Sequence, residues 1–167
     1  MTVTPLLRLH DAILKGAAVI GALILALSVA VTAGAVLGRM VGWRVFAWHV
    51  DAVELGLVLS TFLLAPWVLA KGAHVRVDIV LHLLPPRLSG IVERLAWGWG
   101  ALLCGFLGWL AVDELLSAAQ RGTLFIRAFV IPEWWILTVV PYCFVALCIE
   151  LMLRAAGARR GDERAAI

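Results

Sequence analysis

Four long apolar stretches, separated by short polar segments, dominate the pattern of hydrophobic and polar positions along this chain. They lie at residues 16–38, 52–70, 95–112 and 132–153. Each is close to the roughly 20 residues that an α-helix needs to cross about 30 Å of hydrocarbon. An open strand is excluded there because unpaired backbone groups are too costly in lipid. The pattern predicts an all-α integral membrane protein, with one four-helix domain over residues 1–167.

Composition supports lipid as the solvent of these helices. Hydrophobic residues make up 63% of the chain and charged residues 15%, against roughly 45–50% and about 25% in soluble domains. The first stretch is too long for a signal-peptide core and lacks a recognisable cleavage pattern, so we expect a retained membrane helix. The net charge of +3 is not distributed like a nucleic-acid footprint, and no nucleic-acid partner is expected.

Lysine and arginine are distributed unequally between the two sides that four spans define. Ten of them fall on the side of the termini and the 71–94 loop, and four on the other side. The positive-inside rule therefore places both termini in the cytoplasm of a bacterial-type inner membrane. All eight tryptophans fall at or near predicted span ends, as an interfacial belt requires, with Trp109 assigned to the outer boundary.

The first predicted helix carries a small residue at every fourth position. Lipid supplies little hydrophobic drive between helices, so close backbone approach and van der Waals packing hold them together. The stripe therefore either packs against this protein's own helices or docks onto a helix of a partner. It consists of Ala18, Ala22, Ala26, Ala30, Gly34 and Gly38.

Ionisable residues inside a span are functional candidates because a charge at the bilayer centre is costly, but none is predicted at mid-depth here. Asp51 and Glu54 are assigned to the first turn of the second helix, where Glu54 either caps the helix or contacts a partner. Glu150 is spaced to pair with Arg154 at i,i+4.

The four histidines lie at span ends or in loops, which disfavours a haem between helices. The three cysteines form no CxxC or Cys/His cluster. We expect no catalytic residue, metal ligand or cofactor in this chain.

The most specific pattern begins at the second span and continues into the loop that follows it. An interfacial segment at 74–84 is amphipathic enough to lie as a short helix along the headgroup layer. The order of residues resembles the small permease (DctQ-type) subunit of tripartite ATP-independent periplasmic (TRAP) transporters. The residues that carry the resemblance are Glu54, Lys71, Gly72, His74, Arg76, Asp78, Pro85 and Arg87.

This resemblance implies a role and a set of partners. Transporters of the family join a periplasmic substrate-binding protein, a large polytopic permease subunit and a small subunit of this kind. The large subunit holds the substrate and sodium sites, and an ion gradient drives the uptake of organic acids. The small subunit then acts as a scaffold rather than an enzyme. The resemblance further implies that Asp78 pairs with Arg76, Lys71 or a partner cation, and that His74 hydrogen-bonds nearby backbone.

Two other classes of protein also have four short membrane spans. A membrane anchor of a respiratory enzyme would bind quinone or haem between its helices, and an absorption spectrum would reveal haem. A small homodimeric exporter would need an essential carboxylate deep in the membrane, and this chain is long for that class. The histidine and carboxylate positions disfavour both alternatives.

Overall fold

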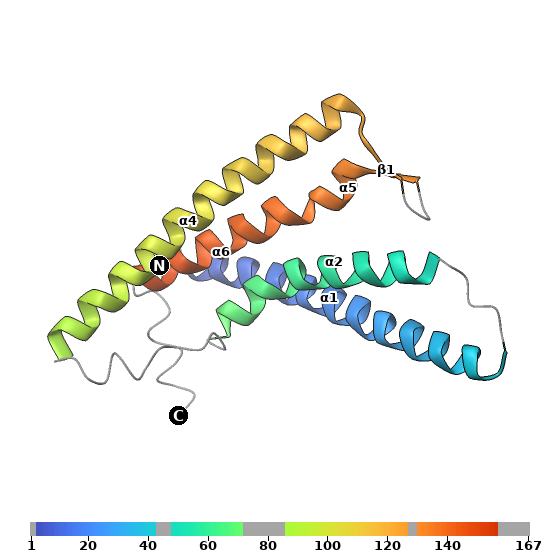
Figure 1. Ribbon diagram of the computed structural model, residues 1–167. Coiled ribbons are helices and arrows are strands. Elements are labelled where there is room, and N and C mark those ends of the chain that lie inside the picture. Colours follow the sequence, from blue (N-terminus) through green and yellow to red (C-terminus); the bar gives the residue numbers. More distant parts are fainter. Residues whose placement is uncertain (1–2, 43–47, 72–85, 127–129, 157–167) are drawn as a thin grey trace.

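The computed structural model describes residues 3–42, 48–71, 86–126 and 130–156. Helices make up nearly all of this part of the chain (Figure 1). In chain order, the elements are α1 (Val3–Met40), α2 (Trp48–Ala70), α4 (Pro86–Arg121), β1 (Leu124–Ile126), β2 (Val130–Pro132), α5 (Glu133–Leu137) and α6 (Val139–Ala155).

Four helical segments are long and apolar enough to cross a membrane, which confirms the all-α membrane class. The last of them combines α5 and α6. Each of the four apolar stretches in the sequence lies inside its segment or within one residue of it. The segments are Leu7–Met40, Trp48–Ala70, Gly90–Arg121 and Glu133–Ala155.

Two helices are longer than the apolar stretches that indicated them. α1 has 38 residues and α4 has 36, so each is about 55 Å long at 1.5 Å per residue. α4 continues through Asp113 and Glu114 to Arg121. Trp109, which the sequence assigned to the outer membrane boundary, therefore lies about three turns before the end of α4. Hydropathy locates the apolar part of a helix, whereas the hydrogen-bonded helix continues through charged residues.

The helices pack as two antiparallel pairs, α1 with α2 and α4 with α6. The two pairs lie close together where α2 and α6 end, and they diverge toward the β-hairpin (Figure 1). At the close end, α2 also packs against α6. A small apolar cluster of Leu69, Ala101 and Leu151 joins α2, α4 and α6 there. The pairs are therefore held together mainly at one end of the molecule.

Buried positions of α1 follow a seven-residue repeat, and its two central members, Gly21 and Ser28, lie against α2. Leu14, Gly21, Ser28 and Ala35 are all buried. A Cβ at Gly21 would lie 3.0 Å from Leu64 Cγ and 3.1 Å from Leu63 Cβ, which shows how closely the two backbones approach. A repeat of seven residues is typical of left-handed helix packing at a small crossing angle.

The predicted four-residue stripe does not coincide with this face. Ala18 is buried and Gly38 is half-buried, but the four stripe residues between them are exposed. Each step of four residues turns about 40° around the helix, whereas a step of seven turns only about 20° in the opposite sense. A four-residue stripe therefore leaves the contact face within two steps. Internal packing does not account for the middle of the stripe, namely Ala22, Ala26, Ala30 and Gly34.

A short β-hairpin, which the sequence did not reveal, connects α4 to α5. Phe125 pairs with Ile131 at the centre of its antiparallel register, and the Glu133 N–H donates to the Thr123 carbonyl oxygen at 3.1 Å. The last span is interrupted at Thr138, whose hydroxyl donates to the Trp134 carbonyl oxygen at 2.8 Å. Pro141 follows in the first turn of α6, where a missing N–H is tolerated.

Candidate functional site

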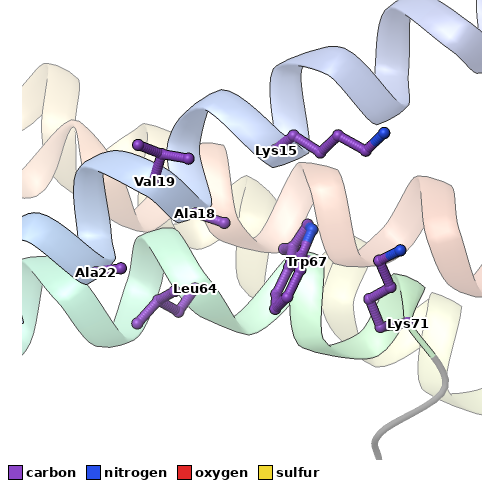
Figure 2. Close-up of a pocket in the computed structure, with 7 residues that line it drawn as sticks. All are labelled: Lys15, Ala18, Val19, Ala22, Leu64, Trp67 and Lys71. Carbon is purple, nitrogen blue, oxygen red and sulfur yellow. The ribbon is translucent and has the colours of Figure 1, made fainter.

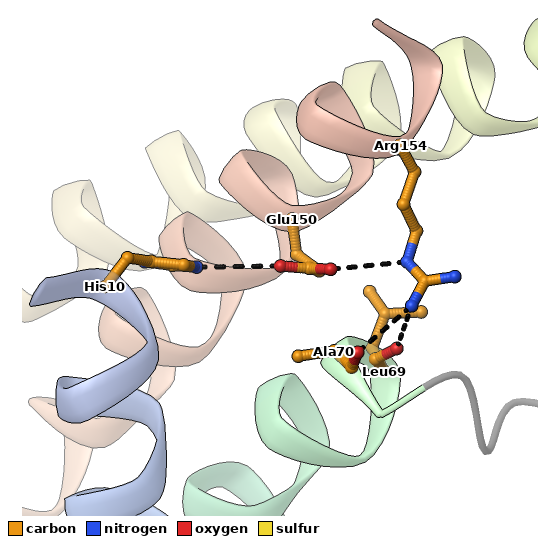
Figure 3. Close-up of polar contacts among 5 residues, drawn as sticks. All are labelled: His10, Leu69, Ala70, Glu150 and Arg154. Carbon is orange, nitrogen blue, oxygen red and sulfur yellow. Dashed lines mark hydrogen bonds and ion pairs between the residues drawn. The ribbon is translucent and has the colours of Figure 1, made fainter. Parts of the chain in front are cut away.

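A buried arginine organises the end of the bundle where the two helix pairs meet. The Arg154 side chain, in the last turn of α6, is only 7% exposed. Its Nη2 donates to the carbonyl oxygens of Leu69 at 2.8 Å and Ala70 at 3.2 Å. These carbonyls belong to the last turn of α2 and have no acceptor role within that helix. Arg154 therefore caps α2 from α6 (Figure 3).

Glu150 lies one turn earlier on α6 and is completely buried. The Arg154 Nε donates to its Oε1 at 3.3 Å, so the i,i+4 pair predicted from the sequence is confirmed. Burial makes this pair costly to form, and the added hydrogen bonds to α2 offset part of that cost. Once formed, the pair is costly to break, because the remaining charge would stay buried.

His10 brings α1 into the same group. Its Nε2 lies 3.8 Å from the second carboxylate oxygen of Glu150, which is beyond hydrogen-bond distance and gives an ion pair when the imidazole is protonated. Figure 3 shows the imidazole directed from α1 toward Glu150. The sequence placed His10, like the other histidines, at a span end or in a loop. It could not show this contact, because 140 positions separate His10 from Glu150.

Trp97 adds α4 to the group. The Arg154 guanidinium lies 5.3 Å from the centre of the Trp97 indole, within the range of a cation–π contact. Contacts from one arginine and one carboxylate thus reach all four long helices. We call His10, Trp97, Glu150 and Arg154, with the carbonyls of Leu69 and Ala70, the polar clamp. Its chemistry is that of a structural joint between helices.

The structure corrects the prediction for Glu54. α2 begins at Trp48, so Asp51 lies in its first turn as predicted, whereas Glu54 lies in the second turn and is exposed. The prediction that Glu54 lies in the first turn, where the unsatisfied N–H groups of a helix are, is therefore wrong. His49 and Asp51 interrupt the apolar pattern before residue 52, so hydropathy placed the start of this span later than the helix begins.

Most of the loop motif lies outside the described residues. Lys71 is described with its side chain: its N–H donates to the Trp67 carbonyl oxygen at 3.0 Å, and its Nζ lies 5.9 Å from the centre of the Trp67 ring. Arg87 falls in the first turn of α4, but its side chain is not described. The predicted interfacial helix at 74–84 is outside the described residues as well, as are Gly72, His74, Arg76, Asp78 and Pro85.

The described residues include no group of three or more histidine, cysteine, aspartate or glutamate side chains arranged to hold a metal ion. The charged side chains that they do bury, Glu150 and Arg154, contact each other and neighbouring helices. Fold and site together define a small helical membrane protein with an internal structural joint.

Comparison with protein families identifies the class of assembly. The model of the family described as "Tripartite ATP-independent periplasmic transporters, DctQ component" matches residues 28–161. The chain belongs to this family, as its resemblance indicated, and the family is a component of membrane transporters. No curated protein and no solved structure matches it. The match does not favour the respiratory-anchor alternative.

Proposed function

We propose that this chain is the scaffold subunit of a TRAP-type secondary transporter. It braces a large polytopic permease, which carries out ion-gradient-driven uptake of an organic acid delivered by a periplasmic binding protein. The family match over residues 28–161 carries this proposal. It includes residues 28–40 of α1 and all of α2, α4, α5 and α6, so three of the four long helices and the C-terminal third of α1 fall within the family match.

The polar clamp supports a bracing role rather than an ion pathway within this chain. A transport site needs groups that can bind and release the transported ion during the cycle. Glu150 and Arg154 instead hold α2 and α6 together at hydrogen-bond distance. Opening this pair would leave buried charges without their partners, which is energetically costly. The sodium and substrate sites are therefore expected in the permease subunit.

The middle of the small-residue stripe supports the presence of a helical partner. Ala26, Ala30 and Gly34 lie off the seven-residue contact face and are exposed. A Cβ at Gly34 would meet no other atom within 4 Å. Small residues on the outside of a membrane helix permit close approach of another helix. We assign this surface to the permease.

The orientation follows from charge. With ten lysine and arginine residues on the side of the termini and four on the other, both termini lie in the cytoplasm by the positive-inside rule. The β-hairpin then lies on the periplasmic side, where a binding protein docks. In this orientation the loop that contains Asp78 is cytoplasmic.

Co-purification tests the scaffold role. The tagged chain, extracted from native membranes in mild detergent, should recover a large polytopic permease. A variant carrying both Ala26→Leu and Ala30→Leu should lose most of that partner, since two large side chains prevent close helix approach. A matched control carrying Leu27→Ile and Val29→Ile, which changes exposed apolar residues of the same helix, should retain it.

Two outcomes would contradict the proposal. Full recovery of the permease by the double leucine variant would show that the small-residue stripe is not part of the interface. Recovery of haem, flavin or soluble redox subunits instead of a permease would contradict the role in a transporter. It would support the role of a membrane anchor for a respiratory enzyme. A separate variant, Asp78→Asn, tests the loop motif: normal assembly and normal uptake would show that Asp78 has no role in either.

A further inference from the structure

A groove runs along the outside of the α1–α2 pair, near the end that carries the polar clamp. Its volume is about 410 Å³. Two alanines of α1, Ala18 and Ala22, form its floor because their side chains end at Cβ. Val19 and Leu64 form its apolar walls (Figure 2). This part of the groove, called the channel below, is lined by methyl and methylene groups.

The other lining residues are an aromatic ring and two lysines. Trp67 rises from α2 toward α1, with Lys15 of α1 and Lys71 of α2 on the same side of it (Figure 2). Both lysines are exposed. Lys71 follows the last residue of α2, so its ammonium lies where the chain leaves the apolar layer. A tryptophan with neighbouring lysines is typical of the headgroup level of a membrane.

We propose that this groove binds one anionic glycerophospholipid. The phosphate lies between the ammonium groups of Lys15 and Lys71, and an acyl chain follows the groove past Ala18 and Ala22. Charge complementarity selects the headgroup: basic pockets between membrane helices bind anionic lipid heads. The apolar channel selects a lipid over free phosphate, which has no group to place beside Val19 or Leu64.

The geometry also favours a lipid chain over a partner helix at this position. Lys15 and Trp67 flank the channel at its charged end, and a second helix inserted there would have to bury a lysine. An acyl chain needs only a channel one methylene wide, and the lysine stems can extend along it while their charges stay at the surface. The more distant part of the stripe, from Ala26 onward, remains available for the permease.

Native mass spectrometry of the full-length chain tests this site. The protein is purified in mild detergent and mixed with equal amounts of phosphatidylglycerol and phosphatidylcholine. We expect the wild type to retain one phosphatidylglycerol in preference to phosphatidylcholine. The combined change Lys15→Ala and Lys71→Ala should lower that retention on the order of tenfold, since each lysine contributes to anionic headgroup binding.

Three variants separate charge, groove and folding. Lys15→Arg with Lys71→Arg should keep the lipid because both charges remain. Ala22→Phe should lose it, with both lysines in place, because the ring fills the channel. Arg39→Ala with Arg121→Ala removes two exposed cations from the far ends of α1 and α4 and should keep it. An unchanged elution volume shows that each variant is folded.

The results that would overturn the site are equally specific. They are equal retention of both lipids by the wild type, or undiminished phosphatidylglycerol binding by the double alanine variant. Displacement of the lipid by soluble glycerol phosphate would show a headgroup site without a chain site. If Ala22→Phe abolishes permease recovery but leaves lipid retention unchanged, the groove is a helix-docking surface instead.

Discussion

At the scale of single residues, Arg154 makes more contacts in the structure than its position in the sequence predicts. Sequence spacing identified its partner Glu150, because residues four apart on a helix are neighbours. Its bonds to the carbonyls of Leu69 and Ala70 and its contact with Trp97 depend on helices that are distant in sequence. The sequence predicted Arg154 only as one member of an ion pair within a helix, whereas in the structure it connects three helices.

A double-mutant cycle tests the buried pair. Arg154→Met leaves the Glu150 carboxylate buried without its guanidinium and should lower the free energy of unfolding by about 3–5 kcal/mol. Adding Glu150→Leu should recover a large part of that loss, since both charges are then gone. The measurement is denaturant-induced unfolding of the purified chain in detergent, and additive effects of the two changes would contradict the model of a coupled pair.

An exposed ion pair provides the matched control for this cycle. Nη2 of Arg121 lies 2.7 Å from Oε1 of Glu114, and the two side chains are 58% and 61% exposed. Water screens such a pair, and exposed pairs contribute about 0–1 kcal/mol. Arg121→Met should therefore have little effect on unfolding, although its ion-pair distance is shorter than that of the buried pair.

At the scale of elements, α1 presents two different faces. The residues at seven-residue spacing pack on α2, and the stripe at four-residue spacing turns outward. The sequence contains both patterns, and composition alone does not rank them, since both consist mostly of small residues. Which one faces α2 is decided by the crossing geometry of the pair, and that geometry depends on side chains of α2 such as Leu63 and Leu64.

Two glycines of α1 distinguish these faces experimentally. Gly21→Ala would place its Cβ 3.1 Å from Leu63 Cβ and 3.3 Å from the Ser60 carbonyl oxygen, so we expect a loss of about 1–3 kcal/mol from overpacking. Gly34→Ala meets nothing within 4 Å and should be neutral or slightly stabilising through helix propensity. Thermal unfolding of each variant in detergent measures the difference, and equal stability of the two would show that the seven-residue face is not the contact face.

At the scale of the whole molecule, two helix pairs are joined at one end and diverge at the other (Figure 1). The polar clamp and the Leu69 cluster lie at the joined end. The diverging ends expose large apolar side chains on α1, α4 and α5, among them Leu37, Trp109 and Trp135. Lipid or the permease must cover these surfaces, which agrees with the role of a subunit in a larger membrane complex.

Cysteine labelling tests the orientation of the molecule. In a background with Cys104, Cys143 and Cys148 replaced by alanine, a membrane-impermeant thiol reagent applied to intact spheroplasts should label Thr123→Cys. Arg8→Cys should be labelled only after the membrane is opened. The reverse pattern would place the termini outside and contradict the positive-inside assignment.

The sequence by itself determined the class, the four spans and the family, because these depend on local hydrophobicity and on a short motif. It also determined the Glu150–Arg154 pair, because helical spacing makes it local. Only the tertiary structure decided which face of α1 is internal, that Glu54 is not in the first turn, and that His10 reaches Glu150. Each of these depends on where helices begin and how they cross, which is fixed by contacts between residues far apart in the chain.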